Sequence, residues 1–396
     1  MNNDDLKKKI EQIVDDYICF SEEERVEKSI RRYTLCNLQV FIGYDFNKEL
    51  YAIYCTIPEC SKGKAFDVFK KEIEKICCSE KDIVSGIMDY IKELKEASLK
   101  DFAVLSSIKG LKMNCIKKSF GEFQIIKTPE GKDIITSMGH MPTKFFDEWF
   151  EAQSQEKMFL CIKISAQDYN SAIAMAKPKF EEFNAIMKFL LAGSKYRDVY
   201  TLQPDPYGID YIVLEPSSSY KKDTVDRSIH LINAESTSLN NNLSRKVWEL
   251  QKKKRNQKEE RIFNAIIWCG KAMRDQDQKR SFVQLCFALE TLLQVEQSGR
   301  GSVVTPSVMN TLSENAAFIC GNDYEERMKI SKQVKNLYSK RSAIAHGREQ
   351  DISEFDVDEM RLLIVQIITE LLWGTEFENL ERIEQLIDKI NKKKFS

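Results

Sequence analysis

The sequence predicts an α+β N-terminal domain followed by an all-α bundle of helices, and three observations predict this fold class. In the first half of the 396-residue chain, apolar residues recur both at alternate positions and at spacings of three and four, which indicates strands and helices together. The second half shows only the helical spacing. Hydrophobic residues make up 42% and charged residues 31% of the chain, which is typical of a globular protein with room for two domains.

Local patterns predict the elements of the first half, which we assign to one α+β domain over residues 1–225. Helical spacing predicts helices over 4–20, 22–34, 65–78, 82–99 and 167–192. Alternating apolar residues predict strands over 38–43, 50–55, 159–164 and 211–215. The turn Pro129–Gly131 predicts a hairpin between strands at 123–127 and 133–136.

A polar segment over residues 226–257 follows this domain and ends near the basic run Lys252-Lys253-Lys254-Arg255. Such a run is typical of a solvated linker or helix face. A nucleic-acid patch is the alternative, but no aromatic residue interleaves the run. We therefore interpret the segment as a linker.

Helical spacing continues through the remaining residues and predicts an all-α domain over 258–396. The helices are expected over 259–275, 278–296, 305–320, 323–346, 356–373 and 377–392. Asp323 and Glu326 form a capping box at the start of the fourth of these helices, and Gly347 is placed to end it.

Charge and apolar content exclude two classes of protein. Lys plus Arg number 60 and Asp plus Glu number 61, so the chain is not a globally basic nucleic-acid binder, and any RNA contact must use a local patch. The N-terminus has no apolar signal segment and no stretch is long and apolar enough to span a bilayer, so we expect a cytoplasmic protein without membrane contact. The 11 cysteines lack CxxC spacing, which favours free thiols over a metal site.

The helix expected over 323–346 concentrates positive charge. The segment 327–348 contains no acidic residue. Its basic residues are Arg327, Lys329, Lys332, Lys335, Lys340, Arg341 and Arg348. Clustered cations on one helix suit phosphate binding, although a solvated basic face is the simpler interpretation of charge alone.

Arg341 lies on the apolar stripe of this helix, four residues after Leu337 and three before Ile344. Glu290 falls in the same way on the stripe of the helix expected over 278–296. A guanidinium and a carboxylate on core-facing stripes are costly unless they are paired, so we expect each to be the partner of the other. A purely structural ion pair that sets helix register is the alternative.

Tyr338, Ser342 and His346 are spaced four residues apart and so share a helix face next to Arg341. Histidine can move protons near neutral pH, and arginine can grip a phosphate through two hydrogen bonds. This grouping indicates a metal-free phosphodiesterase site. The alternative for His346 is a helix-end residue favoured by the helix dipole, and this is how we interpret the other two histidines, His140 and His230.

The segment Leu337–Gly347, Leu-Tyr-Ser-Lys-Arg-Ser-Ala-Ile-Ala-His-Gly, resembles the R-x4-6-H motif of HEPN domains in its Apea-like form. The blocks Ala265–Ala272, Phe287–Leu293 and Glu314–Ala317 are also similar to that family, in the same order. The resemblance covers residues 260–375. It implies that the all-α domain is a HEPN helical bundle.

The resemblance also implies a function. HEPN domains usually form homodimers in which two such motifs face one another, and many are metal-independent endoribonucleases of antiviral abortive-infection or toxin systems. Carried over by position, Arg341 and His346 are the catalytic pair, and no metal or cofactor is required. The residues expected to support them or to bind phosphate are Ser342, Tyr338, Lys340, Glu290 and Arg348. Ser342 stands where many members have Asn, Asp or His, and serine is common in the Apea-like branch.

In the expected reaction, the ribose 2′-OH of an RNA substrate attacks the adjacent phosphate, His346 transfers protons and Arg341 offsets the developing charge. These two residues lie about 140° apart around an ideal helix, so either the last turn is distorted or a second subunit completes the site. A non-catalytic HEPN module that dimerises and binds nucleic acid or a nucleotide is the alternative, and docking of a partner protein's acidic surface is a third. We expect residues 1–225 to sense a phage-derived or protein trigger, or to restrain the nuclease.

Overall fold

In the computed structural model, the chain divides into two compact units, which are described separately below. The structure describes residues 2–19, 41–42, 45–79, 82–108, 110–138, 157–191, 211–214, 232–275, 277–294 and 308–394. The first unit comprises Met1–Ser107, Ile125–Phe180 and Pro204–Val225. The second unit comprises Ile108–Gln124, Glu181–Gln203 and Asp226–Ser396, and so includes two segments of the expected domain 1–225. The described part of the chain has no helix that is both long and apolar enough to cross a membrane.

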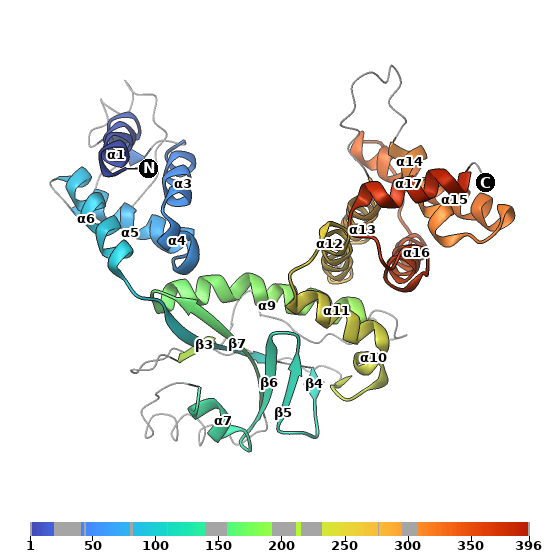
Figure 1. The fold of residues 1–396 in the computed structure, drawn as a ribbon, viewed down its shortest axis with the longest axis horizontal. Coiled ribbons are helices and arrows are strands. Elements are labelled where there is room, and N and C mark those ends of the chain that lie inside the picture. The colour runs from blue at the N-terminus through green and yellow to red at the C-terminus, as the bar shows by residue number, and fades with distance from the viewer. Residues whose placement is uncertain are drawn as a thin grey trace. The chain divides into compact units, whose positions relative to one another are not determined.

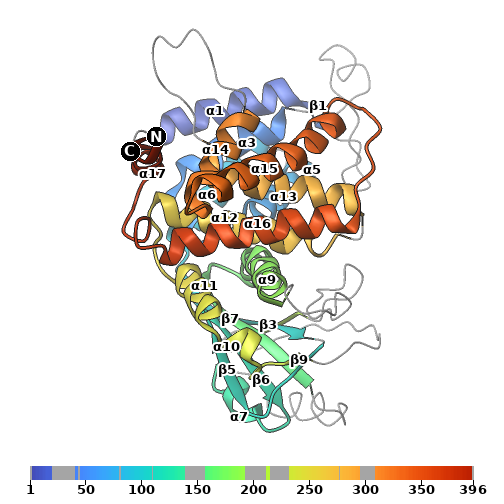
Figure 2. The ribbon, with the colours of Figure 1, turned by 90° about the vertical axis from the view of Figure 1, so that its right-hand side faces the viewer.

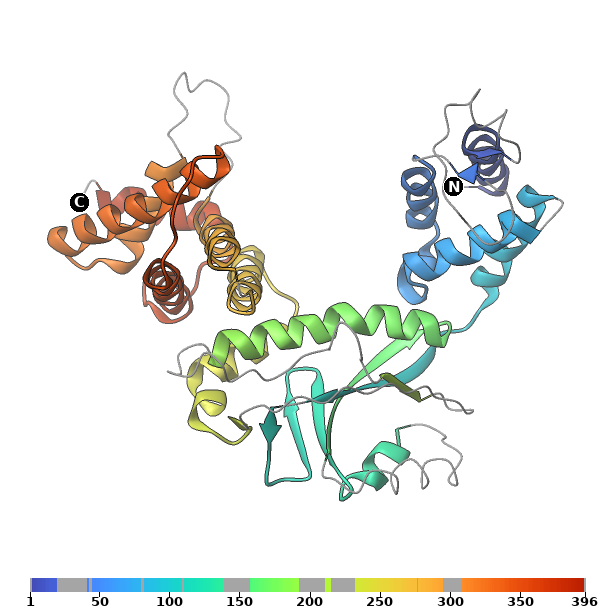
Figure 3. The ribbon, with the colours of Figure 1, turned by 180° about the vertical axis from the view of Figure 1, so that it is seen from behind.

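The first unit begins with a cluster of amphipathic helices (Figures 1 and 3). They are α1 (Asn3–Tyr17), α3 (Phe46–Thr56), α4 (Pro58–Gly63), α5 (Phe66–Ser79) and α6 (Ile83–Glu96). Their apolar residues form one core, which contains Leu6, Ile10, Phe46, Leu50, Ile53, Phe69, Ile73, Ile87 and Ile91. The helix expected over 22–34 lies outside the described residues.

The strand expected over 50–55 is wrong, because this segment forms most of α3. Phe46, Leu50 and Ile53 are all buried and are spaced four and three residues apart, which places them on one face of a helix. A short apolar run satisfies the strand and the helix pattern equally well, and here burial against the neighbouring helices selects the helix.

A five-stranded sheet lies at the centre of the α+β region, with the strand order β5-β6-β7-β3-β8. The strands are β5 (Lys117–Phe120), β6 (Phe123–Thr128), β7 (Lys157–Ala166), β3 (Lys100–Ile108) and β8 (Tyr211–Leu214). β3 pairs antiparallel with β8, and Val104 lies opposite Val213. Two-stranded pairs join β1 (Ile18–Cys19) to β2 (Phe41–Ile42), and β4 (Leu111–Lys112) to β9 (Ile232–Asn233). The expected layout of an α+β region followed by a helical region is therefore present.

The hairpin expected around Pro129–Gly131 is also wrong. The strand β6 is present, but the segment after the turn forms the short helix α7 (Lys132–Thr136). Ile135 is buried in a cluster that contains Ala103, Ile126 and Phe159, so the packing of this side chain stabilises the helical turn. β6 lies beside β5 in the sheet instead, and Gly121, with φ +58°, provides the turn between them.

The segment expected to be a linker is folded over most of its described length. It forms α10 (Thr237–Asn240) and α11 (Asn242–Lys252). Trp248 of α11 packs against Phe120, Phe123 and Phe183, with ring centroids 5.6, 6.3 and 5.4 Å from its own. Phe183 belongs to α9 (Tyr169–Leu191), and this aromatic cluster explains why segments of the first half belong to the second unit.

The rest of the second unit, where the structure describes it, is helical, and Figures 1 and 2 taken together show its helices gathered into one group. They are α12 (Gln257–Ala272), α13 (Gln278–Leu293), α14 (Val308–Cys320), α15 (Tyr324–Ala345), α16 (Glu354–Trp373) and α17 (Ile383–Lys394). The expected all-α region is thus observed. Its core contains Ile266, Phe282, Leu289, Leu312, Val334, Ile364 and Ile368, each fully buried.

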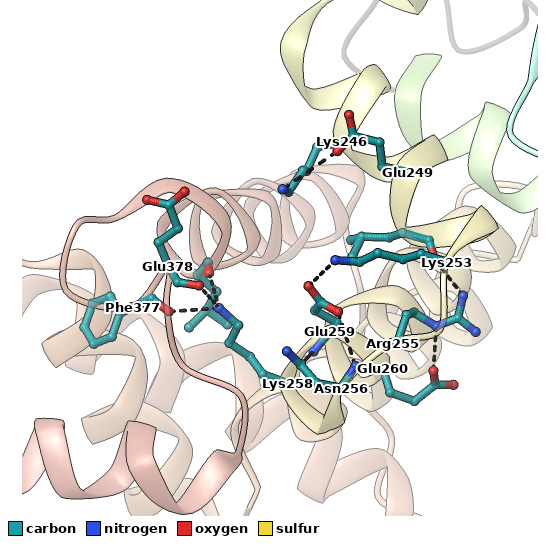
Figure 4. Close-up of polar contacts among 12 residues, drawn as sticks. Lys246, Glu249, Lys253, Arg255, Asn256, Lys258, Glu259, Glu260, Phe377 and Glu378 are labelled. Carbon is teal, nitrogen blue, oxygen red and sulfur yellow. Dashed lines mark hydrogen bonds and ion pairs between the residues drawn. The ribbon is translucent and has the colours of Figure 1, made fainter.

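The basic run at residues 252–255 forms ion pairs at the start of α12 (Figure 4). Lys253 Nζ lies 2.6 Å from Glu259, and Arg255 Nε lies 2.5 Å from Glu260. Nearby, the buried Lys258 donates hydrogen bonds to the backbone carbonyls of Leu371, Phe377 and Glu378, at 3.2, 2.9 and 2.7 Å. The lysine thereby satisfies the Leu371 carbonyl in the last turn of α16, where helical donors run out, and binds two carbonyls of the segment that follows the helix.

Candidate active site

The candidate site is built on α15, which is capped at Asp323 as the sequence predicts, although the second half of the expected capping box is not formed. Asp323 accepts a hydrogen bond from the backbone N–H of Glu326 at 2.9 Å and caps the helix. The Glu326 carboxylate reaches back to the backbone N–H of Asn322, one residue before the cap. The helix then continues through Arg341 and ends at Ala345.

The end of α15 is a Schellman motif. His346 is the C-cap residue, and Gly347 adopts a left-handed conformation with φ +69°. The backbone N–H of Gly347 donates to the Ile344 carbonyl at 3.0 Å, and that of Arg348 donates to the Ala343 carbonyl at 2.9 Å. Arg341 therefore lies within the regular helix, whereas His346 belongs to the turn that ends it.

Arg341 and Glu290 form the ion pair that the sequence predicts. The Arg341 Nε atom lies 3.2 Å from Glu290 Oε1, and the two side chains are 27% and 16% exposed. The Tyr338 hydroxyl donates a hydrogen bond of 2.8 Å to the same oxygen. Glu290 of α13 therefore holds two side chains of α15, and Arg341 lies at the edge of the bundle rather than inside it.

Nε is the atom of the Arg341 guanidinium that lies 3.2 Å from Glu290 in this ion pair. Within the described residues, neither terminal nitrogen of Arg341 makes a hydrogen bond, and the side chain is partly exposed. A guanidinium can bind two oxygens of a phosphate through its parallel N–H groups. The geometry thus leaves Arg341 oriented by a carboxylate and still able to bind an anion.

Burial and the Glu290 carboxylate together raise the pKa values of two neighbouring side chains. Burial, followed by the hydrogen bond to Glu290, raises the pKa of Tyr338 well above its usual value of 10. Burial and the nearby Glu290 charge also raise the pKa of the Cys286 thiol, while Arg341 acts in the opposite direction. Tyr338 and Cys286 are therefore neutral at physiological pH and do not supply a proton acceptor here.

Two aromatic rings accompany the Arg341 guanidinium. Its central carbon lies 5.6 Å from the centroid of the Tyr338 ring and 6.0 Å from that of Phe287. Phe287 in turn contacts Trp268 of α12, with ring centroids 5.4 Å apart. Phe287 and Trp268 lie in sequence blocks that resemble the HEPN family, but the sequence assigned neither a role at the site, because apolar residues in helices usually indicate a core.

Lys340 lies elsewhere, although it precedes Arg341 directly. Its ammonium lies 2.6 Å from Asp356 Oδ1 at the start of α16. The second carboxylate oxygen of Asp356 accepts hydrogen bonds from the backbone N–H and the hydroxyl of Ser353, at 2.9 and 2.8 Å. Burial raises the pKa of Asp356, but the hydrogen bonds from Lys340 and Ser353 outweigh it and lower the pKa overall. The helix was expected to begin at residue 356, and neither its Ser353–Asp356 capping box nor the pairing of Asp356 with Lys340 was predicted.

His346 and Arg348 are exposed, and Ser342 is half-buried, all near the end of α15. In the described part of the chain, the imidazole of His346 has no ion pair or hydrogen bond that would connect it to Arg341. The structure therefore brings Arg341, Glu290 and Tyr338 together but does not unite Arg341 with His346 inside one chain.

The end of α15 thus carries a partly exposed guanidinium, which Glu290 orients, and an exposed imidazole. Among the residues that the structure describes, no three His, Cys, Asp or Glu side chains lie close enough together to bind a metal ion. Comparison with protein-family models, with curated proteins and with solved structures found no match for this chain.

Proposed function

We propose that the helical region over residues 258–396 is a HEPN domain and acts as a metal-independent endoribonuclease. The observation that carries the proposal is the partly exposed Arg341 guanidinium, which pairs with Glu290 through Nε and whose terminal nitrogens make no hydrogen bond to the residues that the structure describes. The resemblance of Leu337–Gly347 to the R-x4-6-H motif supports the same assignment.

In the proposed reaction, a ribose 2′-OH attacks the neighbouring phosphorus and the bond to the 5′-oxygen breaks. His346 acts as the general base or acid, and Arg341 offsets the negative charge that develops on the phosphate oxygens. The products are a 2′,3′-cyclic phosphate and a 5′-hydroxyl. Glu290 and Tyr338 act as positioning residues, because they contact Arg341 and each other.

The separation of Arg341 and His346 supports a site shared between two copies of the chain. α15 is helical to Ala345, and His346 is the capping residue that follows it. On a regular helix, two residues that are five positions apart point in directions that differ by about 140°. Two α15 ends related by a two-fold axis would place Arg341 of one copy beside His346 of the other. We therefore include a homodimer in the proposal, with an antiviral or toxin-type role.

The test is a cleavage assay with purified protein, total cellular RNA and EDTA. We expect cleavage of RNA but not of DNA, which lacks the nucleophile, and loss of cleavage in both Arg341→Ala and His346→Ala. Arg382→Ala, which removes an exposed arginine from the loop before α17, is the matched control and should cleave normally. RNA that remains intact with the wild-type chain, while it still binds, would support the non-catalytic binding module instead.

A further inference from the structure

Trp268 of α12 and Phe287 of α13 form an aromatic pair at the surface of the helical region. Their ring centroids are 5.4 Å apart and their planes are inclined by 57°. Both residues are half-buried, whereas the inner positions of the same helices are fully buried: Ile262, Ile266, Cys269, Phe282, Leu285, Cys286 and Leu289. The pair therefore adds little to the closed core, and part of each side chain reaches solvent.

A cation lies at each end of this pair. Lys271 Nζ is 5.4 Å from the centroid of Trp268, and the Arg341 central carbon is 6.0 Å from the centroid of Phe287. Lys271 is exposed, one turn after Trp268 on α12, so its long side chain can move without disturbing the helix. We refer to Lys271, Trp268, Phe287 and Arg341 as the aromatic platform.

The order cation, ring, ring, cation suits a chain that alternates flat bases with negative phosphates. Bases of single-stranded nucleic acid stack on aromatic side chains, while flanking cations pair with the backbone. Glu290 lies beside the platform, and its charge is offset by Arg341. The platform therefore combines two cations with two partly exposed rings.

We propose that the aromatic platform binds single-stranded RNA, with one base stacked on Trp268 and the adjoining phosphates on Lys271 and Arg341. The inference rests on the proposed ribonuclease function and adds to it the way in which substrate reaches Arg341. Because every base has a flat face, the platform can bind RNA of any base sequence. It prefers single strands to duplexes, because the bases of a duplex are already stacked on one another. An acidic peptide would satisfy Lys271 and Arg341 but would leave the rings without a stacking partner.

The experiment measures binding and cleavage separately. A short 2′-O-methyl oligouridine serves as the binding probe, because methylation removes the attacking hydroxyl and prevents cleavage. Titration of the full chain is followed by tryptophan fluorescence and by filter binding, and cleavage is measured with unmodified RNA. The variants are Trp268→Leu, Trp268→Phe and Lys271→Ala, with Trp373→Leu as the matched control, since Trp373 is an exposed tryptophan at the end of α16 and is not part of the platform.

We expect the probe to quench wild-type fluorescence and Trp268→Leu to bind about tenfold more weakly, as the loss of one stacked base implies. Trp268→Phe should keep most of the affinity but lose the quenching, which shows that a folded protein still stacks the base. Trp373→Leu should resemble the wild type, and Lys271→Ala should weaken binding with a shallower salt dependence.

Equal affinity of Trp268→Leu and the wild type for the probe would overturn the platform, and this conclusion would hold even if RNA cleavage were normal. Binding with quenching by a wild-type chain that cleaves nothing would uphold the platform and overturn the nuclease. Competition by an acidic peptide as strong as that by RNA would overturn the assignment of RNA as the occupant.

Discussion

Glu290 Oε1 interacts with two side chains, and this sharing defines the candidate site at the scale of single residues. The Tyr338 hydroxyl approaches it at 2.8 Å and Arg341 Nε at 3.2 Å. Because all three residues are largely buried, an unpaired member of the group costs more free energy than at a fully exposed site. The stability of the chain and the orientation of Arg341 therefore depend on the same carboxylate.

A double-mutant cycle tests this dependence. We expect Glu290→Ala and Tyr338→Phe each to lower the free energy of unfolding by about 1–3 kcal/mol, and the double variant to lose less than their sum, since one hydrogen bond is counted twice. Urea denaturation measures all four proteins. The control cycle pairs Tyr338→Phe with Glu349→Ala, an exposed glutamate, and should be additive. Additivity in the first cycle would contradict the shared contact.

At the scale of elements, polar side chains connect the ends of helices. Lys340 of α15 pairs with Asp356, the carboxylate that caps the start of α16, and Lys258 of α12 donates hydrogen bonds to backbone carbonyls of the segment after the end of α16. The helices of this region are therefore joined at their ends as well as along their apolar faces.

The Lys340–Asp356 pair predicts a dependence of stability on pH. The pKa of Asp356 is lower in the folded chain than its usual 3.8, so its charged form stabilises the fold. This contribution is complete above pH 3.8 and is lost as the pH falls through the lower, folded-state pKa. The difference in urea midpoint between the wild type and Lys340→Met should therefore be larger at pH 7 than at pH 2. Asp351→Asn, at an exposed aspartate, should show no such trend.

The surroundings of Gly270 and Gly347 predict that substitution by alanine lowers the free energy of unfolding by different amounts at the two positions. A Cβ atom at Gly270 of α12 would lie 2.0 Å from the carbonyl oxygen of Ala185 on α9, so Gly270→Ala must push the two backbones apart. A Cβ at Gly347 would meet nothing within 4 Å, and only its positive φ opposes a side chain. We expect Gly347→Ala to cost about 1 kcal/mol, and Gly270→Ala to cost clearly more. Thermal unfolding of both variants measures the difference, and equal costs would contradict the close approach of α9 and α12.

At the scale of the whole molecule, the proposed nuclease depends on two copies of the chain. Arg341 and His346 are not in contact within one copy, so each proposed site takes one residue from each protomer. Sites of this kind can be restored by mixing chains that lack different residues.

Mixing Arg341→Ala with His346→Ala tests this arrangement. A mixed dimer would contain one site with both wild-type residues and one site with neither. Random pairing should therefore restore about a quarter of the wild-type cleavage rate. Size-exclusion chromatography with light scattering checks that dimers form. Dimers that stay inactive after mixing would show that each site lies within a single chain.

Sequence by itself determined the elements with strong caps and long apolar periods. The start of α15 at Asp323, its end at Gly347 and the pairing of Arg341 with Glu290 follow from local rules and from the cost of unpaired charges near a core. Short apolar segments were ambiguous, and α3 and α7 are helices where strands were expected.

Only the tertiary structure decided the partners that lie far apart along the chain. It placed Asp356 against Lys340, Trp248 of the expected linker among Phe120 and Phe183, and Trp268 beside Phe287. Periodicity records which face of a helix is apolar, but it does not record which other helix covers that face. Long-range packing makes that choice, because burial is non-directional and many pairings satisfy the same local pattern.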